Sequence, residues 1–157
     1  MTAVYLPSPH DRAREQAARY EATSGREGGT LDGRPVVILT TTGARTGHIR
    51  KNPIMRIKDG DTYVAVASNG GATTNPSWYH NLIAHPEVWL QDGEMIHRFR
   101  AREVRGEEKA RWWVVADRAW SHFAAFRAEA GDREIPVIVL EPMTPRDHNA
   151  KSASTVS

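Results

Sequence analysis

The 157-residue sequence contains no cysteine, which excludes disulfides, thiolate metal sites and cysteine nucleophiles and fits a reducing compartment. Its longest aliphatic runs, residues 36–39 and 137–140, are far too short to span a bilayer. The N-terminus lacks the apolar core of a signal peptide. From these absences we expect a cytoplasmic protein.

Familiar catalytic and nucleotide-binding motifs are also missing. There is no G-x-G-x-x-G, no P-loop ending in G-K-[ST] and no G-x-S-x-G, so nothing indicates a Rossmann site, a P-loop or a serine hydrolase. The histidines have no cysteine or carboxylate at ligand spacing, as at His80, His85, His97 and His122. We therefore expect no metal site.

What is present is typical of a single soluble domain. Charged residues make up 25% of the chain and hydrophobic residues 39%, with a formal net charge of only +2. We expect a flexible N-terminus over residues 1–10, one domain over 11–142, and a disordered tail rich in Pro, Ser, Thr and Ala over 143–157.

Residue patterns predict a mainly β domain with a few helices. Strands are expected at 34–42, 48–58, 62–68, 87–91, 94–104 and 135–141, and helices at 11–22, from Asn75-Pro76 to His85-Pro86, and at 107–129. Six strands joined mostly by tight hairpins favour a closed or nearly closed antiparallel barrel with helices packed outside. The thin apolar face of the first helix favours packing on the domain over membrane anchoring.

Cations gather in one predicted strand, where Arg50, Lys51 and Arg56 follow a glycine-bracketed turn. Side chains alternate along a strand, so Arg50 and Arg56 should share one face and Lys51 the other, while Pro53 predicts an edge or a bulge. A Gly-rich loop at 69–72 follows the partner strand of this hairpin. Guanidinium groups and successive backbone N–H groups favour phosphate. We therefore interpret the cationic strand and the Gly-rich loop together as a site for an elongated, phosphate-bearing cofactor.

The cationic strand has two other interpretations. A solvated charged strand is the common explanation for such a pattern. Nucleic-acid binding is disfavoured, because base stacking requires exposed aromatics among the cations, and this strand has none.

The predicted long helix carries an aromatic stripe that includes Trp120, Phe123 and Phe126 at three-residue spacing. Core packing is the default explanation for this stripe. The alternative is that part of it lines a pocket for a planar ring.

Four segments together resemble the deazaflavin-dependent nitroreductase family: REGGT, LTTTGARTGHIRKNPIMR, SNGGATTNPSWYHNL and IPVIVLEP. The resemblance covers about residues 20–142. It implies a split β-barrel oxidoreductase, related to flavin-binding reductases, that uses coenzyme F420. Hydride would pass from the reduced cofactor to a planar activated acceptor such as a quinone, an enone or a nitro compound.

The resemblance also implies roles for individual residues. The phosphate and tail of the cofactor would lie on Arg50, Lys51, Asn52 and Pro53, with Arg56 as a further basic contact. The backbone of Ser68, Asn69, Gly70, Gly71 and Ala72 would approach the deazaflavin, with Trp78 and Asn81 flanking the groove. Ser68 and Tyr63 are the candidate hydroxyl donors to the ring or the reduced substrate.

Two departures from the family pattern bear on the substrate. Trp120, Phe123 and Phe126 stand where nitroreductases place tyrosines, and Thr74 stands where a lysine can occur. We therefore expect an apolar pocket that suits quinones at least as well as bulky nitro compounds. An FMN-dependent oxidoreductase and a non-catalytic protein that binds the cofactor or a hydrophobic ligand are the alternatives. Monomer or homodimer, and peripheral membrane contact, stay open.

Overall fold

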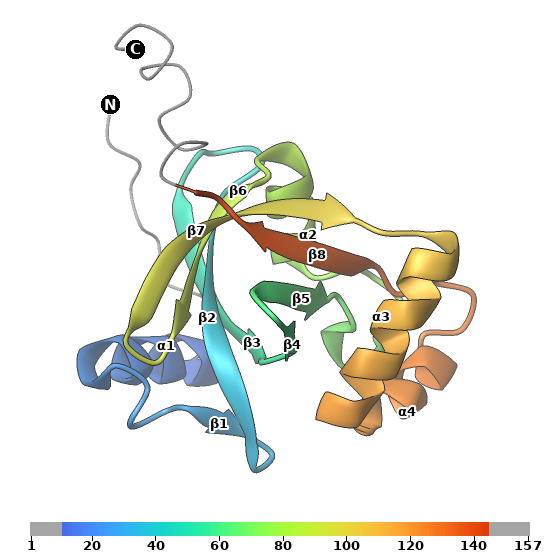
Figure 1. Ribbon diagram of the computed structural model, residues 1–157, viewed down its shortest axis with the longest axis horizontal. Coiled ribbons are helices and arrows are strands. Elements are labelled where there is room, and N and C mark those ends of the chain that lie inside the picture. Colours follow the sequence, from blue (N-terminus) through green and yellow to red (C-terminus); the bar gives the residue numbers. More distant parts are fainter. Residues whose placement is uncertain (1–10, 145–157) are drawn as a thin grey trace, which may run out of the picture.

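The computed structural model describes residues 11–144. The predicted flexible N-terminus and most of the predicted tail lie outside the described residues, whereas Met143 is buried and donates its N–H to the carbonyl of Arg98 at 2.9 Å. The elements, in chain order, are α1 (Asp11–Thr23), β1 (Thr30–Leu31), β2 (Arg34–Thr42), β3 (Ile49–Met55), β4 (Lys58–Asp59), β5 (Thr62–Val66), the 3-10 helix η1 (Asn69–Gly71), α2 (Ser77–Ala84), β6 (Glu87–Asp92), β7 (Met95–Glu103), α3 (Gly106–Ala119), α4 (His122–Glu129) and β8 (Val137–Pro142) (Figure 1).

Over the described part of the chain, the strands form one antiparallel sheet in the order β1-β2-β6-β7-β8-β5-β4, with β3 on β2. The predicted strand 48–58 is two strands, β3 and β4, which are separated by a bend at Arg56 and Ile57. Because β3 pairs with β2 while β4 pairs with β5, this bent segment joins the two ends of the sheet order. The sheet therefore curls into the predicted antiparallel barrel.

β3 is an edge strand, and Pro53 fits it without a bulge. The register with β2 is continuous from Ile49 to Met55. On this register, Arg56 donates its N–H to Pro35 and Gly43 donates its N–H to His48, so the even-numbered residues of β3 exchange hydrogen bonds with β2. Pro53 therefore occupies an outward position where no ladder N–H is needed.

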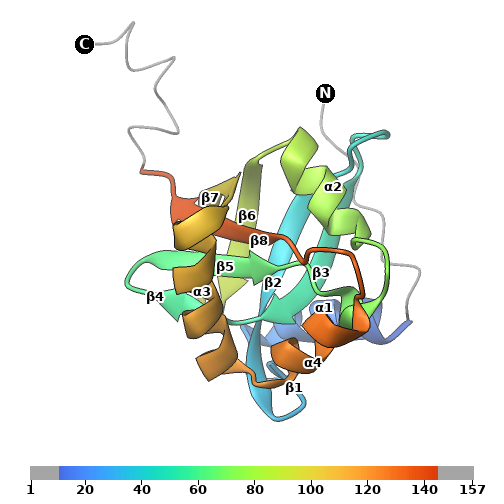
Figure 2. The same cartoon turned by 90° about the vertical axis from the view of Figure 1, so that its right-hand side faces the viewer.

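Alternation along the strands divides the core between the two faces of the sheet. One face contributes residues such as Val37, Leu39 and Phe99, and it packs with Trp78 and Leu82 of α2. The other face packs against α1, α3 and α4; its members include Ala17, Tyr20, Val36, Ile38, Val64, Val139, Ala116 and Phe123. Figure 1 shows α1 at the lower left and the α3–α4 pair at the right, with the lower half of β2 between them in this view, and Figure 2 shows α4 in front of α1.

The helices can be compared with the sequence prediction at three points. The predicted helix 107–129 is two helices, because Trp120 is extended (φ −157°, ψ 109°) between α3 and α4. The N-cap of α2 is Pro76, within the predicted start of this helix at Asn75-Pro76. The buried face of α1 packs on the domain as predicted, through Ala17 and Tyr20. No helix within residues 11–144 is both long and apolar enough to cross a membrane.

Candidate active site

The cations of β3 lie on both faces of this edge strand. Arg50 stands opposite Thr41, and Lys51 stands opposite Thr40, so their side chains point to opposite faces as predicted. Asn52 shares the Arg50 face, and Pro53 shares the Lys51 face. A ligand that follows the open edge of β3 could reach both sets of side chains.

Lys51 and Arg56 already have carboxylate partners. The Nζ of Lys51 lies 2.6 Å from Glu21 Oε2 of α1, and these side chains are 24% and 34% exposed. The Nε of Arg56 lies 2.8 Å from Asp92 Oδ2 at the end of β6. An external anion must therefore compete with Glu21 for Lys51 and with Asp92 for Arg56.

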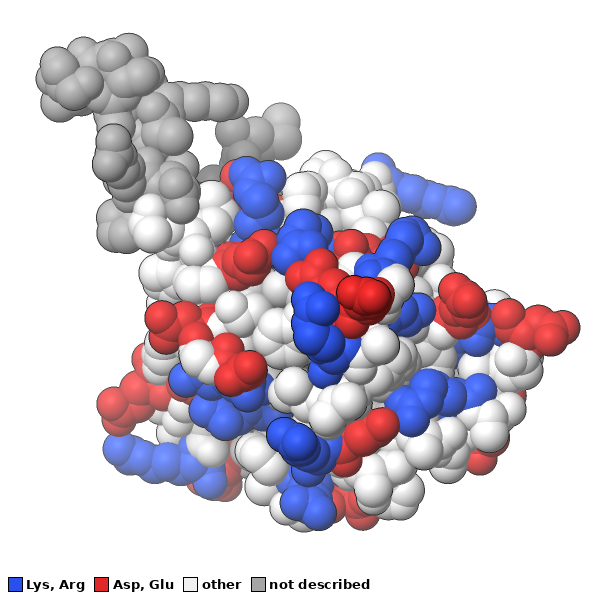
Figure 3. Space-filling view, turned by 45° about the vertical axis from the view of Figure 1, so that its right-hand side comes forward, with Lys and Arg blue, Asp and Glu red and all other residues white. Residues whose placement is uncertain are grey.

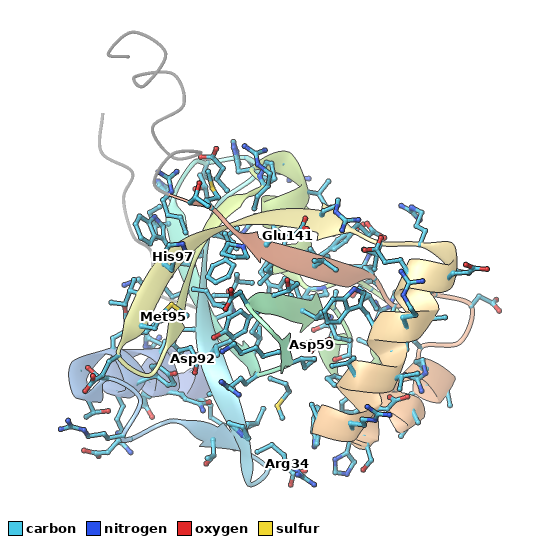
Figure 4. The ribbon with its side chains drawn as sticks, viewed as in Figure 1. Arg34, Asp59, Asp92, Met95, His97 and Glu141 are labelled. Carbon is cyan, nitrogen blue, oxygen red and sulfur yellow. The ribbon has the colours of Figure 1, made fainter. Side chains whose placement is uncertain are left out.

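Asp92, labelled in Figure 4, is the centre of a polar cluster that also holds Tyr63. The Tyr63 hydroxyl donates to Asp92 Oδ2 at 2.5 Å, and its ring packs edge-on against Phe99. Burial and the Asp92 carboxylate raise the pKa of Tyr63 well above its usual value. The Tyr63 hydroxyl therefore keeps its proton, which it donates to Asp92 at the end of β6.

The loop after β5 has the geometry of a backbone anion site. Ser68 is right-handed (φ −69°, ψ −33°) and Asn69 is left-handed (φ 49°), followed by Gly70 at φ 64°. Such an alternation turns successive N–H groups towards one concavity. Among residues 11–144, the N–H groups of Ser68, Asn69 and Gly70 have no backbone acceptor, and the Ser68 side chain makes no cap hydrogen bond. The loop can therefore donate to oxygens of a ligand.

The two loop glycines have different surroundings. A Cβ on Gly71 would lie 2.9 Å from the Cβ of Glu129 and 3.3 Å from the Cα of Phe126, so only glycine lets η1 lie this close to α4. A Cβ on Gly70 would meet nothing within 4 Å. The predicted open approach to the backbone is thus available at Gly70, whereas Gly71 serves packing.

The aromatic stripe reaches the same region through α4. The Trp120 ring lies edge-on to Phe123 and Phe126, at 5.2 Å between ring centroids in each case. Phe123 is 1% exposed and belongs to the core, whereas Trp120 and Phe126 are half-buried. Because the Phe126 backbone adjoins Gly71, this half-buried member of the stripe lies close to the loop, and Trp120 packs against it.

Arg133 is a residue of this region that sequence analysis missed. Its guanidinium donates to the carbonyls of Ala67 (3.0 Å), Ser68 (2.7 Å) and Ala72 (2.9 Å), and to Asn75 Oδ1 at 2.5 Å. Loss of hydration lowers the pKa of Arg133. No motif marks it, since it lies in a loop about sixty residues away from its partners.

Trp78 and Asn81 lie mostly within the protein, each at 9% exposure. Trp78 belongs to the core cluster beneath α2. Asn81 Oδ1 accepts the N–H of Ala44 at 3.0 Å, and its Nδ2 donates to Thr41 Oγ1 at 3.2 Å. These two residues fix α2 against the turn that leads into β3, and so they contribute to the position of the cations.

Neither of two surface cavities is lined by a predicted cofactor residue. One, of about 380 Å³, lies between α3, α4 and Arg133, and the other, of about 340 Å³, lies between the end of α2 and β6–β7. In the described chain no group of three or more His, Asp or Glu could hold a metal ion. The face in Figure 3 intersperses acidic and basic side chains, unlike the continuous basic surface expected for nucleic-acid binding.

Comparison with known proteins identifies the family. The model of the family described as F420H(2)-dependent quinone reductase matches residues 12–142. The chain belongs to this family. An F420H(2)-dependent quinone reductase of Mycobacterium tuberculosis H37Rv is 36% identical over 127 residues, covering 78% of this chain and 85% of the relative.

Two solved structures resemble this member of the quinone reductase family. One, described as an F420-H2 dependent reductase (FDR-A), is 43% identical with a TM-score of 0.65, over 69% of this chain and 95% of the other. The second, described as a domain-swapped dimer, is 41% identical with a TM-score of 0.67, over 85% of this chain and 100% of the other. The family and the barrel expected from the sequence motifs are confirmed.

Proposed function

We propose that this protein is a reductase that transfers hydride from reduced coenzyme F420 to a quinone-type acceptor. The observation that carries the proposal is the family match over residues 12–142, which includes every residue of the predicted cofactor site. The structure supports it with two features that suit a ring attached to a polyanionic tail. Cations lie along the edge of β3, and N–H groups of the loop after β5 have no backbone acceptor in the described part of the chain.

In this proposal the residues of the chain bind and orient the reactants. Arg50 and Lys51 contact the anionic tail from the two faces of β3, after Lys51 exchanges Glu21 for the tail. The N–H groups of Ser68, Asn69 and Gly70 bind electron-rich ring oxygens, and the Ser68 hydroxyl donates to the ring or to the reduced acceptor. When bound, reduced coenzyme F420 supplies the hydride, so the protein needs no catalytic triad.

The acceptor side of the proposed site is apolar. Trp120 and Phe126 offer ring faces and edges and no phenol hydroxyl, and the Tyr63 hydroxyl is engaged by Asp92. A flat conjugated acceptor would bind mainly by burying apolar area and excluding water. These properties favour a quinone, while enones and nitro compounds of similar shape remain substrates to test.

The proposal is tested by following oxidation of F420H2 with a soluble naphthoquinone, together with the affinity for oxidised F420. Arg50→Ala combined with Lys51→Ala should weaken F420 binding by about 100-fold, because two charge-assisted contacts are removed. Arg111→Ala combined with Arg118→Ala, on the exposed side of α3, is the control and should leave the affinity unchanged. Equal affinities in the two double variants would contradict the site assignment.

Two alternatives make different predictions in the same assays. An FMN enzyme would bind FMN more tightly than F420, because one phosphate needs fewer cations than an oligoglutamate tail. A cofactor-storage protein would bind F420 tightly and oxidise no F420H2 with quinones, enones or nitroaromatics.

We further propose that the protein is a cytoplasmic homodimer. Trp89 and Ile96 are 46% and 60% exposed on the β6–β7 hairpin, and one similar protein is described as a domain-swapped dimer. Light scattering should give twice the chain mass, and a monomer mass at high protein concentration would contradict the proposal. Co-sedimentation with phospholipid vesicles tests peripheral membrane contact.

A further inference from the structure

We propose that Arg133 is a positioning residue for the cofactor, because it aims the N–H groups of the loop after β5. The inference rests on the proposed function. Its starting point is one guanidinium that donates to three carbonyls of the same loop, those of Ala67, Ser68 and Ala72. Asn75 Oδ1, just before α2, is the fourth acceptor. The hydrogen bonds of Arg133 therefore span the loop from the end of β5 to the start of α2.

The direction of these carbonyls fixes the direction of the N–H donors. In a trans peptide the C=O and the N–H point to opposite sides, and the described chain contains no cis peptide. Carbonyls of Ala67 and Ser68 that face Arg133 therefore turn the N–H groups of Ser68 and Asn69 away from it. These are two of the three donors in the concavity assigned to the ring. Arg133 thus sets the aim of the donors without touching the ligand.

The charge of Arg133 acts in the same direction. Within residues 11–144 no carboxylate pairs with its guanidinium, whose acceptors are carbonyl and amide oxygens. A cation on a peptide oxygen polarises that peptide and strengthens its N–H as a donor. The positive charge behind the loop also favours electron density on the ligand side.

Lysine cannot replace arginine in this role. A guanidinium presents several N–H donors in a rigid planar fork, whereas an ammonium is a compact charge on a flexible stem. Arg133→Lys keeps the charge and loses the simultaneous contact with Ala67, Ser68 and Ala72. The substitution therefore separates geometry from charge.

The experiment compares Arg133→Lys with Arg127→Lys. Arg127 makes a bidentate ion pair with Asp117, at 3.0 Å for each contact, and its guanidinium lies 4.1 Å from the Trp113 ring centroid. The control substitution therefore also removes a bidentate guanidinium contact, at a place away from the loop. Arg133→Lys should speed amide hydrogen exchange over 67–75 and raise both the Kd for F420 and the KM for F420H2 at least tenfold. The KM for the quinone should stay near that of the wild type. The change in the F420 absorption spectrum on binding should shrink, because it reports hydrogen bonds to the ring.

Asn75→Ala removes one of the four acceptors and should give a smaller effect in the same direction, which keeps the test valid if Arg133→Lys folds poorly. An Arg133→Lys protein with faster loop exchange, an unchanged Kd and an unchanged F420 spectrum would overturn this inference and leave the proposed function intact. A wild-type protein that does not bind F420 would overturn the proposed function and this inference with it.

Discussion

The two neighbouring glycines of the loop give a matched pair of substitutions with different expected outcomes. Gly70 and Gly71 both have positive φ, at 64° and 82°, so alanine at either position costs about 1 kcal/mol of conformational strain. At Gly70 a methyl group meets nothing within 4 Å, and the strain is the whole cost. At Gly71 the methyl group is forced against Glu129 and the Phe126 backbone, which adds about 1–3 kcal/mol of overpacking.

Urea unfolding followed by circular dichroism measures the difference. We expect Gly71→Ala to lower the free energy of unfolding by about 1–3 kcal/mol more than Gly70→Ala does. We expect Gly70→Ala, with its methyl group on the open side of the loop, to weaken F420 binding several-fold. Equal destabilisation by the two substitutions would refute the packing of η1 on α4. Unchanged F420 affinity in Gly70→Ala would refute the placement of the ligand at this loop.

Four further predictions follow from an ion pair, two buried hydroxyls and a buried amide. Glu21→Gln releases Lys51 and should tighten F420 binding by about two- to fivefold at low salt, the range of a partly exposed ion pair. Calorimetry that shows weaker binding would contradict this. Tyr63→Phe removes the hydrogen bond to Asp92 and should cost about 1–2 kcal/mol of stability while kcat with a quinone is unchanged. Because burial raises the pKa of Tyr63 and of Tyr20 in the folded state, the unfolded chain loses these protons first. Stability should therefore fall above about pH 10, by up to about 1.4 kcal/mol per pH unit for each tyrosine, and Tyr63→Phe should lessen that slope in urea titrations at pH 9 to 11. Asn81→Ala should cost about 2 kcal/mol of stability, because the amide links α2 to Ala44 and Thr41, and a stability equal to wild type would show those bonds to be dispensable.

Local pattern was sufficient to predict the barrel. The apolar β-branched run of β2 predicted a strand, and the Asp-Gly pairs at residues 59–60 and 92–93 are typical of hairpin turns. β3 alternates its cations as expected from its period of two. The edge position of β3 was also foreseeable, because proline has no N–H for a ladder. The family followed from long motifs, which carry more information than any single residue.

Partners distant in the sequence could not be predicted in this way. Glu21 lies 30 residues before Lys51, and Asp92 lies 36 residues after Arg56, so no spacing rule joins them. Arg133 looked like an ordinary charged loop residue. The curled sheet is what brings these groups together.

The break between α3 and α4 also depends on tertiary structure. No glycine or proline marks Trp120, and local propensity favours a continuous helix. Trp120 Nε1 instead donates to Asp32 Oδ2 at 3.1 Å, in the turn between β1 and β2, and its ring packs on Phe123 and Phe126. These distant contacts favour the extended backbone over another helical turn.

The most direct test of the central claim is a fluorescence titration of the purified protein with oxidised coenzyme F420 and, separately, with FMN at moderate salt. Saturable binding of F420 that is clearly tighter than binding of FMN is the predicted result. Tighter binding of FMN, or no binding of either compound, would contradict the assignment of F420 as the cofactor of this protein.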